Sequence, residues 1–477
     1  MKKYTYLFSI IIIILIFPLA DNFIHFVKPA PLNGDFQNTP KPDFSFKSFL
    51  SGDFQKKEKE YLKENLNIYP LLVKLNNQLQ FNLFKHINLR NAIVGKGDIL
   101  FDITYINAYY GNDYRGDTTI KYISEEINFM NKILKLYNKK LVVCVLPGKP
   151  HFYEKYIPDS LKHPKDKTNA GEILKYLDKT AVPNIELTNY LLSIADTSKY
   201  AIYPKESIHL STYSTVFIAD TLIKFMNKKL NTDFPELQYT IAESEKPKFY
   251  DNDIIVGINI FNPPNYNSHF AYPEIKNPDK KATYRVLTIG DSFYKNFYKL
   301  GIHKKYFNSD NYYYYGKLSW PEMTDIYQGN KLRIDFIKNT DIILIYATDA
   351  TMYLFPYEFT SKIAKSILPF DKGIIREFFL LKLKHNKEWQ NNIKNKAKEN
   401  NISYAEQKER DINYMINKHI NDLCEEDKKL YRITKQIKSD SIWYKNIEQK
   451  AKEKQISTEY SLMLDAIYIY NKNNKKQ

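Results

Sequence analysis

The sequence predicts an α/β fold: a parallel β-sheet flanked by helices, with an N-terminal membrane anchor and an all-α C-terminal region that contains repeats. Three apolar runs rich in β-branched residues indicate buried strands, at 141–146, 284–289 and 341–346. Segments with helical periodicity lie between them, and strands that alternate with helices indicate a parallel sheet covered by helices. A chain of 477 residues exceeds one compact core, so two or three domains are expected.

Residues 1–30 predict a signal anchor. Two lysines precede an apolar run over residues 4–20, a length between a signal-peptide core and a full membrane span. Pro18-Leu19-Ala20 is a poor cleavage site and apolar residues resume at Phe23, so we expect an uncleaved anchor, with a removed signal peptide as the alternative. With the lysines in the cytoplasm, everything after residue 30 lies outside the inner (cell) membrane. The expected location is therefore periplasmic or extracytoplasmic.

Composition argues against nucleic acid as a partner. The net charge is +16, but only seven of the 70 basic residues are arginine, the residue favoured for bidentate phosphate recognition. No zinc-finger spacing or RNA-binding signature is present. The charge is interpreted as a solvated lysine-rich surface, and an anionic lipid or polysaccharide partner is the weaker alternative. The two cysteines, Cys144 in a strand and Cys424 in a polar helical region, do not support a disulfide.

Residues 31–90 are expected to form a stalk and a helical lead-in, and residues 91–358 the α/β domain. The stalk is rich in prolines, and apolar positions at helical spacing follow from residue 55 to 89. Two short strands around a Gly-Lys-Gly-Asp turn open the domain at residue 91. Further helices are expected at 120–136, 170–177 and 214–230, and a loop-rich stretch precedes the strand at 284–289.

Residues 363–477 are expected to form a helical domain with two tandem repeats, because one pattern recurs 54 positions later. The first copy contains Trp389, Ile393, Lys396-Ala397-Lys398-Glu399, Ile402-Ser403, Asp411 and Tyr414; the second contains Trp443, Ile447, Lys450-Ala451-Lys452-Glu453, Ile456-Ser457, Asp465 and Tyr468. The spacing predicts two three-helix units, in which the Ile-Ser pair marks a helix break and serine caps the next helix. The tryptophans are interpreted as packing residues, with ligand platforms as the alternative.

The candidate nucleophile is Ser292. The strand at 284–289 breaks into Gly290-Asp291-Ser292-Phe293, which places the serine hydroxyl at the carboxyl end of a buried strand. Open α/β sheets bind their ligands at that edge. The backbone N–H of Ser292 is expected to form half of an oxyanion hole. The alternative is a plain strand-to-helix turn that Ser292 caps.

A nucleophilic serine needs a base, and His209 is the best-placed histidine. It lies in a loop before the helix at 214–230, and Glu206 is the carboxylate nearest in sequence that could orient its imidazole. His151, His269 and His303 are weaker candidates for the same role.

Several short stretches, in order, resemble the SGNH-hydrolase-like domain of the alginate O-acetylation (AlgX/AlgJ-type) polysaccharide acetyltransferase family. The matching pieces are the turn at 94–101, the strand end at 146–150 with Tyr153, the His209 region, the Gly290-Asp291-Ser292-Phe293 turn and the strand at 341–346. The resemblance covers residues 55–358, and the histidine precedes the serine, the reverse of ordinary SGNH hydrolases. It implies an SGNH-like parallel sheet in the domain at 91–358.

One position departs from the family pattern Asp-x-His-Trp. The equivalents here are Ser207, Ile208, His209 and Leu210, so the orienting aspartate is missing. The departure leaves three alternatives open: a serine–histidine dyad, Glu206 as a substitute for the aspartate, or a domain without catalysis.

The resemblance implies ping-pong acetyl transfer, in which Ser292 takes an acetyl group from the membrane side and passes it to a sugar hydroxyl. It implies two partners, an anionic or neutral exopolysaccharide and a multispanning membrane acyltransferase that supplies the acetyl group. Gly290 and Asp291 are expected to line the oxyanion and substrate site. The second oxyanion donor is expected at Thr348 or Thr351.

Lys149 is expected to contact an anionic substrate, with a surface salt bridge as the alternative. No cofactor or metal is expected, because Gly95-Lys96-Gly97 lacks the glycine spacing and the Lys-Ser/Thr ending of a P-loop. Two functions compete with acetyl transfer: an esterase that uses the same Ser292 and His209, and a catalytically inactive scaffold or glycan-binding component of a polysaccharide-modification complex.

Overall fold

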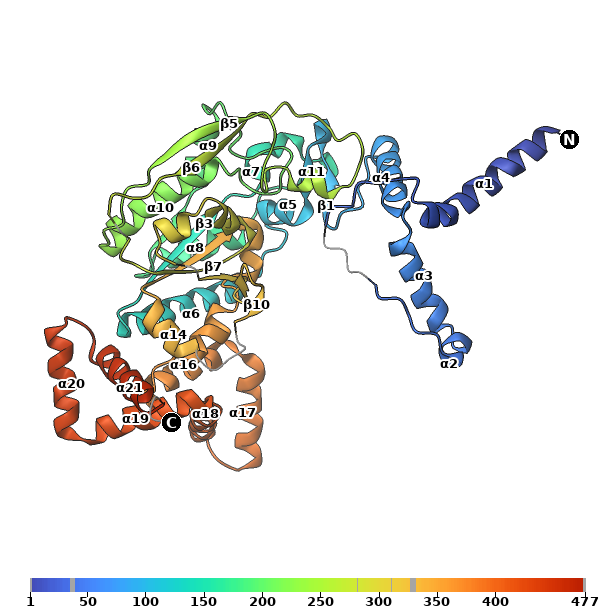
Figure 1. Ribbon diagram of the computed structural model, residues 1–477. Helices are drawn as coiled ribbons and strands as arrows, with labels where there is room; N and C mark the ends of the chain where they lie inside the picture. Colours follow the sequence, from blue (N-terminus) through green and yellow to red (C-terminus); the bar gives the residue numbers. More distant parts are fainter. Residues whose placement is uncertain (1, 35–38, 281, 310, 327–331, 475–477) are drawn as a thin grey trace.

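The computed structural model describes the chain except residues 1, 35–38, 281, 310, 327–331 and 475–477 (Figure 1). Its centre is a seven-stranded sheet of order β10-β9-β8-β7-β11-β3-β4. The strands are β3 (Lys140–Leu146), β4 (Asn184–Glu186), β7 (Val286–Gly290), β8 (Tyr312–Tyr314), β9 (Leu318–Trp320), β10 (Thr324–Asp325) and β11 (Ile342–Thr348). The strands from β8 to β4 are parallel, whereas β9 and β10 extend the sheet in antiparallel pairs. The predicted parallel sheet is confirmed, and the three apolar runs form β3, β7 and β11.

Alternation along β3 divides the core into two layers. Leu141, Val143 and Val145 face one layer, where α6 (Asp117–Leu136) and α8 (Asn169–Leu177) pack. The intervening residues Val142 and Cys144 face the other layer. That second layer is covered by α9 (Thr188–Ala195), α10 (Ser214–Leu230) and α12 (Lys295–Lys299). Successive side chains of a strand point to opposite faces, so a central strand buried on both faces is apolar throughout.

The N-terminal region lies to one side of the sheet and contains four helices (Figure 1). They are α1 (Lys2–Ile24), α2 (Phe46–Leu50), α3 (Asp53–Asn65) and α4 (Tyr69–Phe84). Among the described helices, α1 alone is long and apolar enough to cross a membrane, over residues 4–24. Its C-terminal end is tied to the α3–α4 junction, because the Asn67 side-chain amide donates to Asp21 at 2.7 Å and to the Val27 carbonyl at 2.7 Å.

Short elements connect this region to the sheet. The expected pair of short strands is present as β1 (Ala92–Val94) and β2 (Leu100–Asp102), which pair in antiparallel fashion. The helix α5 (Ile103–Tyr110) follows them. The remaining short helices of the α/β part are α7 (Pro150–Tyr153), α11 (Asp253–Gly257), α13 (Ile302–Lys305), α14 (Leu332–Asn339) and α15 (Ala364–Ile367).

The stretch expected to be loop-rich contains a third sheet, of two strands. Strands β5 (Tyr239–Ser244) and β6 (Phe270–Ile275) pair in antiparallel register, and α11 lies in the connection between them. β6 is mostly buried and β5 is mostly not, and Ile275 of β6 belongs to the apolar cluster of the second core layer. This connection carries a residue of the candidate active site, described below.

The C-terminal region consists of two three-helix units. The first is α16 (Lys372–His385), α17 (Lys387–Glu399) and α18 (Tyr404–Asn421); the second is α19 (Glu425–Ser439), α20 (Ser441–Glu453) and α21 (Thr458–Asn474). Equivalent ion pairs recur in both units, Lys396–Asp411 at 3.1 Å and Lys450–Asp465 at 2.8 Å. Ser403 accepts a hydrogen bond from the N–H of Glu406 and so caps α18 as predicted.

These helices share a core with the sheet. Ile393, Ile412 and Met463 belong to the same apolar cluster as the β3 and α6 side chains. A buried ion pair also crosses the boundary, because Arg333 of α14 lies 3.0 Å from Asp427 of α19, and their side chains are 1% and 8% exposed.

Asp427→Ala is expected to lower the free energy of unfolding by about 3–5 kcal/mol, because it leaves the Arg333 charge buried without its partner. Urea unfolding of the purified chain measures the change. The matched control is Glu409→Ala, which breaks the exposed Arg376–Glu409 pair. This control is expected to cost less than about 1 kcal/mol. Equal losses in the two variants would contradict the prediction.

Candidate active site

Ser292 lies directly beyond the carboxyl end of β7, between the parallel neighbours β11 and β8. It is the first residue of a 3₁₀ turn over Ser292–Tyr294. The first N–H groups of a helical turn have no partner within the turn. The Ser292 backbone N–H therefore has no partner within its own turn, which suits the oxyanion-donor role expected from the sequence.

A buried network fixes the turn that presents Ser292. The Asp291 carboxylate accepts hydrogen bonds from the N–H and hydroxyl of Thr348, each at 2.8 Å, and from the hydroxyl of Thr351 at 2.7 Å. It also caps the turn by accepting from the N–H of Phe293. Gly290 is required by close strand packing, because a Cβ atom there would lie 2.4 Å from the carbonyl oxygen of Tyr346. The ends of β7 and β11 are thus locked together.

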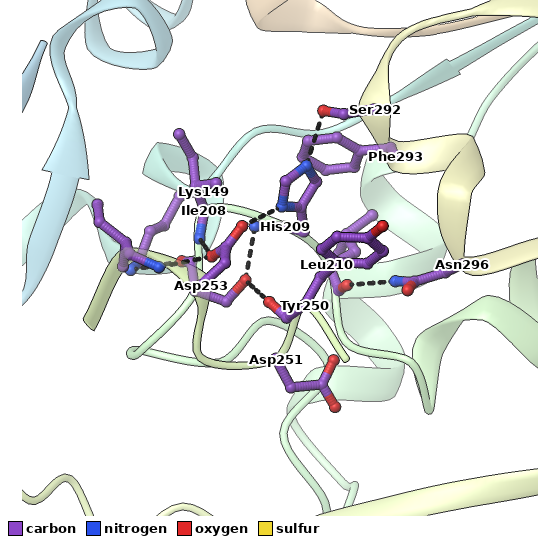
Figure 2. A network of polar contacts seen from close by, with 12 residues as sticks. Lys149, Ile208, His209, Leu210, Tyr250, Asp251, Asp253, Ser292, Phe293 and Asn296 are labelled. Atoms are coloured by element: carbon purple, nitrogen blue, oxygen red, sulfur yellow. Dashed lines mark hydrogen bonds and ion pairs between the residues drawn. The ribbon is translucent and has the colours of Figure 1, made fainter. Parts of the chain in front are cut away.

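His209 and Ser292, 83 positions apart in sequence, form a hydrogen bond. The distance from His209 Nε2 to Ser292 Oγ is 2.7 Å, and the other ring nitrogen, Nδ1, lies 2.5 Å from Oδ2 of Asp253 (Figure 2). A hydroxyl, an imidazole and a carboxylate therefore form one continuous chain of hydrogen bonds. This is the arrangement in which an imidazole can remove the hydroxyl proton while the carboxylate holds the ring and its tautomer.

The loop that carries His209 is held from several sides. Ser207 accepts a hydrogen bond from the backbone N–H of His209 at 2.8 Å and donates to the carbonyl of Tyr250 at 2.7 Å. The second oxygen of Asp253 accepts from the N–H of Ile208 at 2.9 Å. The His209 ring packs against Phe293, with ring centroids 4.8 Å apart. The loop is therefore held in place both by Phe293, which follows the nucleophile Ser292, and by Asp253, the carboxylate at the imidazole.

Asp253, not Glu206, is the carboxylate at the imidazole. Glu206 accepts a hydrogen bond from the Ser268 hydroxyl at 2.8 Å, and its backbone carbonyl accepts from Ile255. The expectation for Glu206 rested on sequence proximity, whereas the carboxylate comes from α11, 44 residues after His209. Ser207, two residues before His209, supports the loop through its hydrogen bonds.

Asp253 is kept ionised by its partners. Burial acts to raise the pKa of its carboxyl group, but the charge and hydrogen bond of His209, with the N–H of Ile208, outweigh burial and hold this pKa below its usual value. An ionised carboxylate is an acceptor only, so it favours a proton on Nδ1 of His209 and leaves Nε2 as the acceptor for the serine proton.

Lys149 does not lie on the surface, which corrects both expectations for it. The residue is 1% exposed, and its ammonium group donates to the carbonyls of Lys205 at 2.7 Å and of Ser207 at 2.9 Å. Burial lowers its pKa to about 7. It lies at the start of α7, just after β3, and it fixes the loop that leads to His209 rather than reaching a substrate.

Thr348 and Thr351 are not placed as oxyanion donors. Both hydroxyl groups and the Thr348 N–H donate to the Asp291 carboxylate, so these donors are already used. Asp291 is itself fully buried and supports the turn from within. Of the four residues expected to line the oxyanion and substrate site, Asp291, Lys149 and Thr348 form buried supports, and Gly290 permits close strand packing.

The three weaker histidine candidates do not lie at Ser292. His151 pairs with Asp349 at 2.8 Å, His269 is exposed, and His303 is buried against the ring of Tyr298. Across the described residues, no group of three or more His, Cys, Asp or Glu side chains is arranged to hold a metal ion.

Asp251 lies beside this site, and its burial is expected to make the stability of the chain depend on pH. Its carboxylate is 1% exposed and accepts from the N–H and hydroxyl of Thr212, three residues after His209. Burial raises its pKa to about 7. The folded chain therefore holds this proton more tightly than the unfolded chain. The resulting stability is complete below pH 4 and is lost as pH rises through 7.

Asp251→Asn is expected to abolish the loss of stability with rising pH, because an asparagine carries no charge and still offers an acceptor to Thr212. Relative to the variant, the wild-type chain should lose on the order of 4 kcal/mol of unfolding free energy between pH 4 and pH 8. Urea unfolding at a series of pH values measures the difference. Parallel curves for the two proteins would contradict the prediction.

No family model and no curated protein matches the sequence. Among solved structures, the chain is similar to the O-acetyltransferase domain of Pseudomonas putida AlgJ, at 12% identity and a TM-score of 0.40 over 58% of this chain and 100% of that chain. It is also similar to Bacillus cereus PatB1 with a sulfonyl adduct, at 11% identity and a TM-score of 0.38 over 57% of this chain and 99% of that chain. A third similar structure is Pseudomonas aeruginosa AlgX, at 12% identity and a TM-score of 0.37 over 55% of this chain and 67% of that chain. AlgJ and AlgX are the types that the order of sequence motifs resembles.

Proposed function

We propose that this chain is an O-acetyltransferase that acts on an exported cell-surface polysaccharide through an acetyl-Ser292 intermediate. The observation that carries the proposal is the chain of hydrogen bonds from Ser292 through His209 to Asp253. It lies at the carboxyl end of the sheet, where α/β folds bind their ligands. The order of motifs in the sequence favours a saccharide acceptor. The apolar helix α1 favours an extracytoplasmic location.

In the first half-reaction, His209 Nε2 takes the proton of Ser292 as Oγ attacks the carbonyl carbon of an acetyl donor. The negative charge that develops on the carbonyl oxygen is stabilised by the N–H of Ser292. The bond to the leaving group then breaks, and His209 returns its proton to that group. Acetyl-Ser292 and the deacylated donor remain.

In the second half-reaction, the neutral imidazole of His209 removes a proton from a sugar hydroxyl. The sugar oxygen attacks the acetyl carbonyl, the bond to Ser292 Oγ breaks, and Oγ recovers the proton from His209. Asp253 stabilises the imidazolium in both steps without itself taking up the proton. The acetyl donor is supplied by a multispanning membrane acyltransferase in this proposal.

The test uses the purified chain and p-nitrophenyl acetate as donor. Mass spectrometry of a rapidly quenched reaction should find the acetyl group on the peptide that contains Ser292. Addition of an oligosaccharide should then yield an acetylated sugar. Release of acetate alone, whatever saccharide is added, would assign the same residues to an esterase. If no acetyl-enzyme forms and no acetate is released, the proposal is wrong, and a catalytically inactive scaffold or glycan-binding component is favoured instead.

A further inference from the structure

A cavity opens at the edge of the sheet that carries Ser292, and the mechanism above does not use it. Its volume is about 980 Å³, at the upper end of the range for small-molecule sites. It extends from Asp349, just after β11, past the end of β3 to the edge strand β4. The helices α8 and α9 contribute its outer walls. A cavity that crosses the ends of three neighbouring strands has room for more than one monomer unit of a polymeric ligand.

The inner end of this cavity contains a second pair of histidine and carboxylate. His151 Nε2 lies 2.8 Å from Oδ2 of Asp349, and no described residue bonds to its Nδ1. Asp349 is 8% exposed, and its Oδ1 has no hydrogen-bond partner among the described residues. A Cβ atom on Gly148 would lie 2.6 Å from that oxygen, so the glycine permits the carboxylate to occupy this position. Polar groups buried without partners are costly unless a ligand or water satisfies them.

The rest of the lining combines aliphatic side chains with charged, amide and aromatic ones. Lys165 lies 4.2 Å from the centroid of the Tyr109 ring and 3.6 Å from the Glu154 carboxylate. The Tyr109 ring also meets the His151 ring edge-on at 4.8 Å. Three lysines and four carboxylates line the whole cavity: Lys165, Lys175, Lys179, Glu154, Asp178, Glu186 and Asp349. Balanced charge without arginine disfavours a phosphate-rich ligand, and seven charged side chains in the walls disfavour a purely apolar acyl chain.

Shared elements place this cavity next to the Ser292 site. The helix α5 contributes Tyr109 to the cavity, and its Tyr105 stacks on Phe293, the residue after Ser292, at 6.2 Å. Asp349 directly follows Thr348, which bonds to Asp291 beneath Ser292. A ligand in the cavity would therefore lie along the edge of the sheet that presents the nucleophile.

We propose that this cavity binds sugar residues of the acceptor saccharide, with His151, held by Asp349, as hydrogen-bond partner of a sugar hydroxyl. Hydroxyl-rich sugars match a lining of amides, carboxylates, lysines and an aromatic ring. The ligand class is an oligosaccharide that is neutral or carries one charge per sugar unit. This inference rests on the proposed function of Ser292 and names the acceptor site for that reaction. His151 is here a binding residue and takes no part in the chemistry at Ser292.

The experiment compares two cavity variants with a control. Asn189→Trp fills the outer part of the cavity from α9, and His151→Gln keeps a donor for Asp349 while removing the imidazole. Ser193→Trp, at an exposed position of the same helix outside the cavity, is the matched control. Each variant is assayed for hydrolysis of p-nitrophenyl acetate and for acetyl transfer to maltotetraose, cellotetraose, chitotetraose and tetramannuronate. Saccharide binding is measured separately in Ser292→Ala by saturation-transfer NMR.

We expect transfer to fall at least tenfold in both cavity variants through a higher KM for the saccharide, whereas hydrolysis and transfer in Ser193→Trp stay within twofold of wild type. Binding should be present in Ser292→Ala and lost when Asn189→Trp is added. If none of the four sugars binds, or if binding and transfer survive both cavity variants, this inference is wrong. If a sugar binds in the cavity but no Ser292-dependent transfer occurs, the cavity assignment stands and the proposed function fails.

Discussion

Ser292→Ala is expected to reduce kcat for acetyl transfer and for ester hydrolysis on the order of 10⁶-fold, to the rate of the background reaction. The substitution removes the one oxygen to which the acetyl group would be attached, and the His209–Asp253 pair alone provides no covalent path. In serine hydrolases, loss of the nucleophile alone costs about as much as loss of the whole catalytic group. Rates with p-nitrophenyl acetate, and mass spectrometry of the quenched protein, measure the effect.

The control for this prediction is Ser193→Ala, an exposed serine on α9. It should retain wild-type rates and the acetyl-enzyme. Thermal unfolding should give similar Tm values for both variants, because Ser292 is not part of the apolar core. An unchanged rate in Ser292→Ala would mean that another group carries the acetyl chemistry.

The sheet could be predicted because its central strands are buried on both faces. β3, β7 and β11 are apolar at nearly every position, which is the pattern of a strand between two helical layers. The antiparallel pair β5–β6 could not be predicted from the sequence. Most residues of β5 are not buried, so β5 has no apolar pattern. The C-terminal repeat was visible in the spacing of its packing residues. Its shared core with the sheet depends on contacts between distant segments.

Part of the candidate site was predictable for a different reason. Ser292 follows a buried strand at a glycine turn, and His209 precedes a helix, so local patterns place both at the same edge of the sheet. Lys149 has the local pattern of a surface loop, Pro147-Gly148-Lys149-Pro150. Its burial is a tertiary effect, since it bonds to carbonyl groups of a loop more than fifty residues away.

Asp253 was missed because its partner is distant in sequence. It stands in Tyr250-Asp251-Asn252-Asp253, where the second of two acidic residues begins a short apolar helix within a stretch without clear periodicity. That pattern is typical of a helix start, where acidic residues are favoured for capping. The signal that could have found it is the combination of a missing aspartate two residues before His209 and an unassigned acidic pair in the same domain.

Asp253→Asn is expected to reduce kcat about 10⁴-fold, while Glu206→Gln leaves it within about twofold. An asparagine can occupy the same volume, but it can present its amide N–H to Nδ1 of His209. The ring would then carry its proton on Nε2 and could no longer accept the proton of Ser292. Glutamine at position 206 retains an acceptor for the Ser268 hydroxyl and does not touch the imidazole. The two variants test whether Asp253 or Glu206 is the carboxylate that orients His209. Steady-state rates with p-nitrophenyl acetate measure both effects. A larger loss of kcat in Glu206→Gln than in Asp253→Asn would mean that Glu206, not Asp253, orients the imidazole during the reaction.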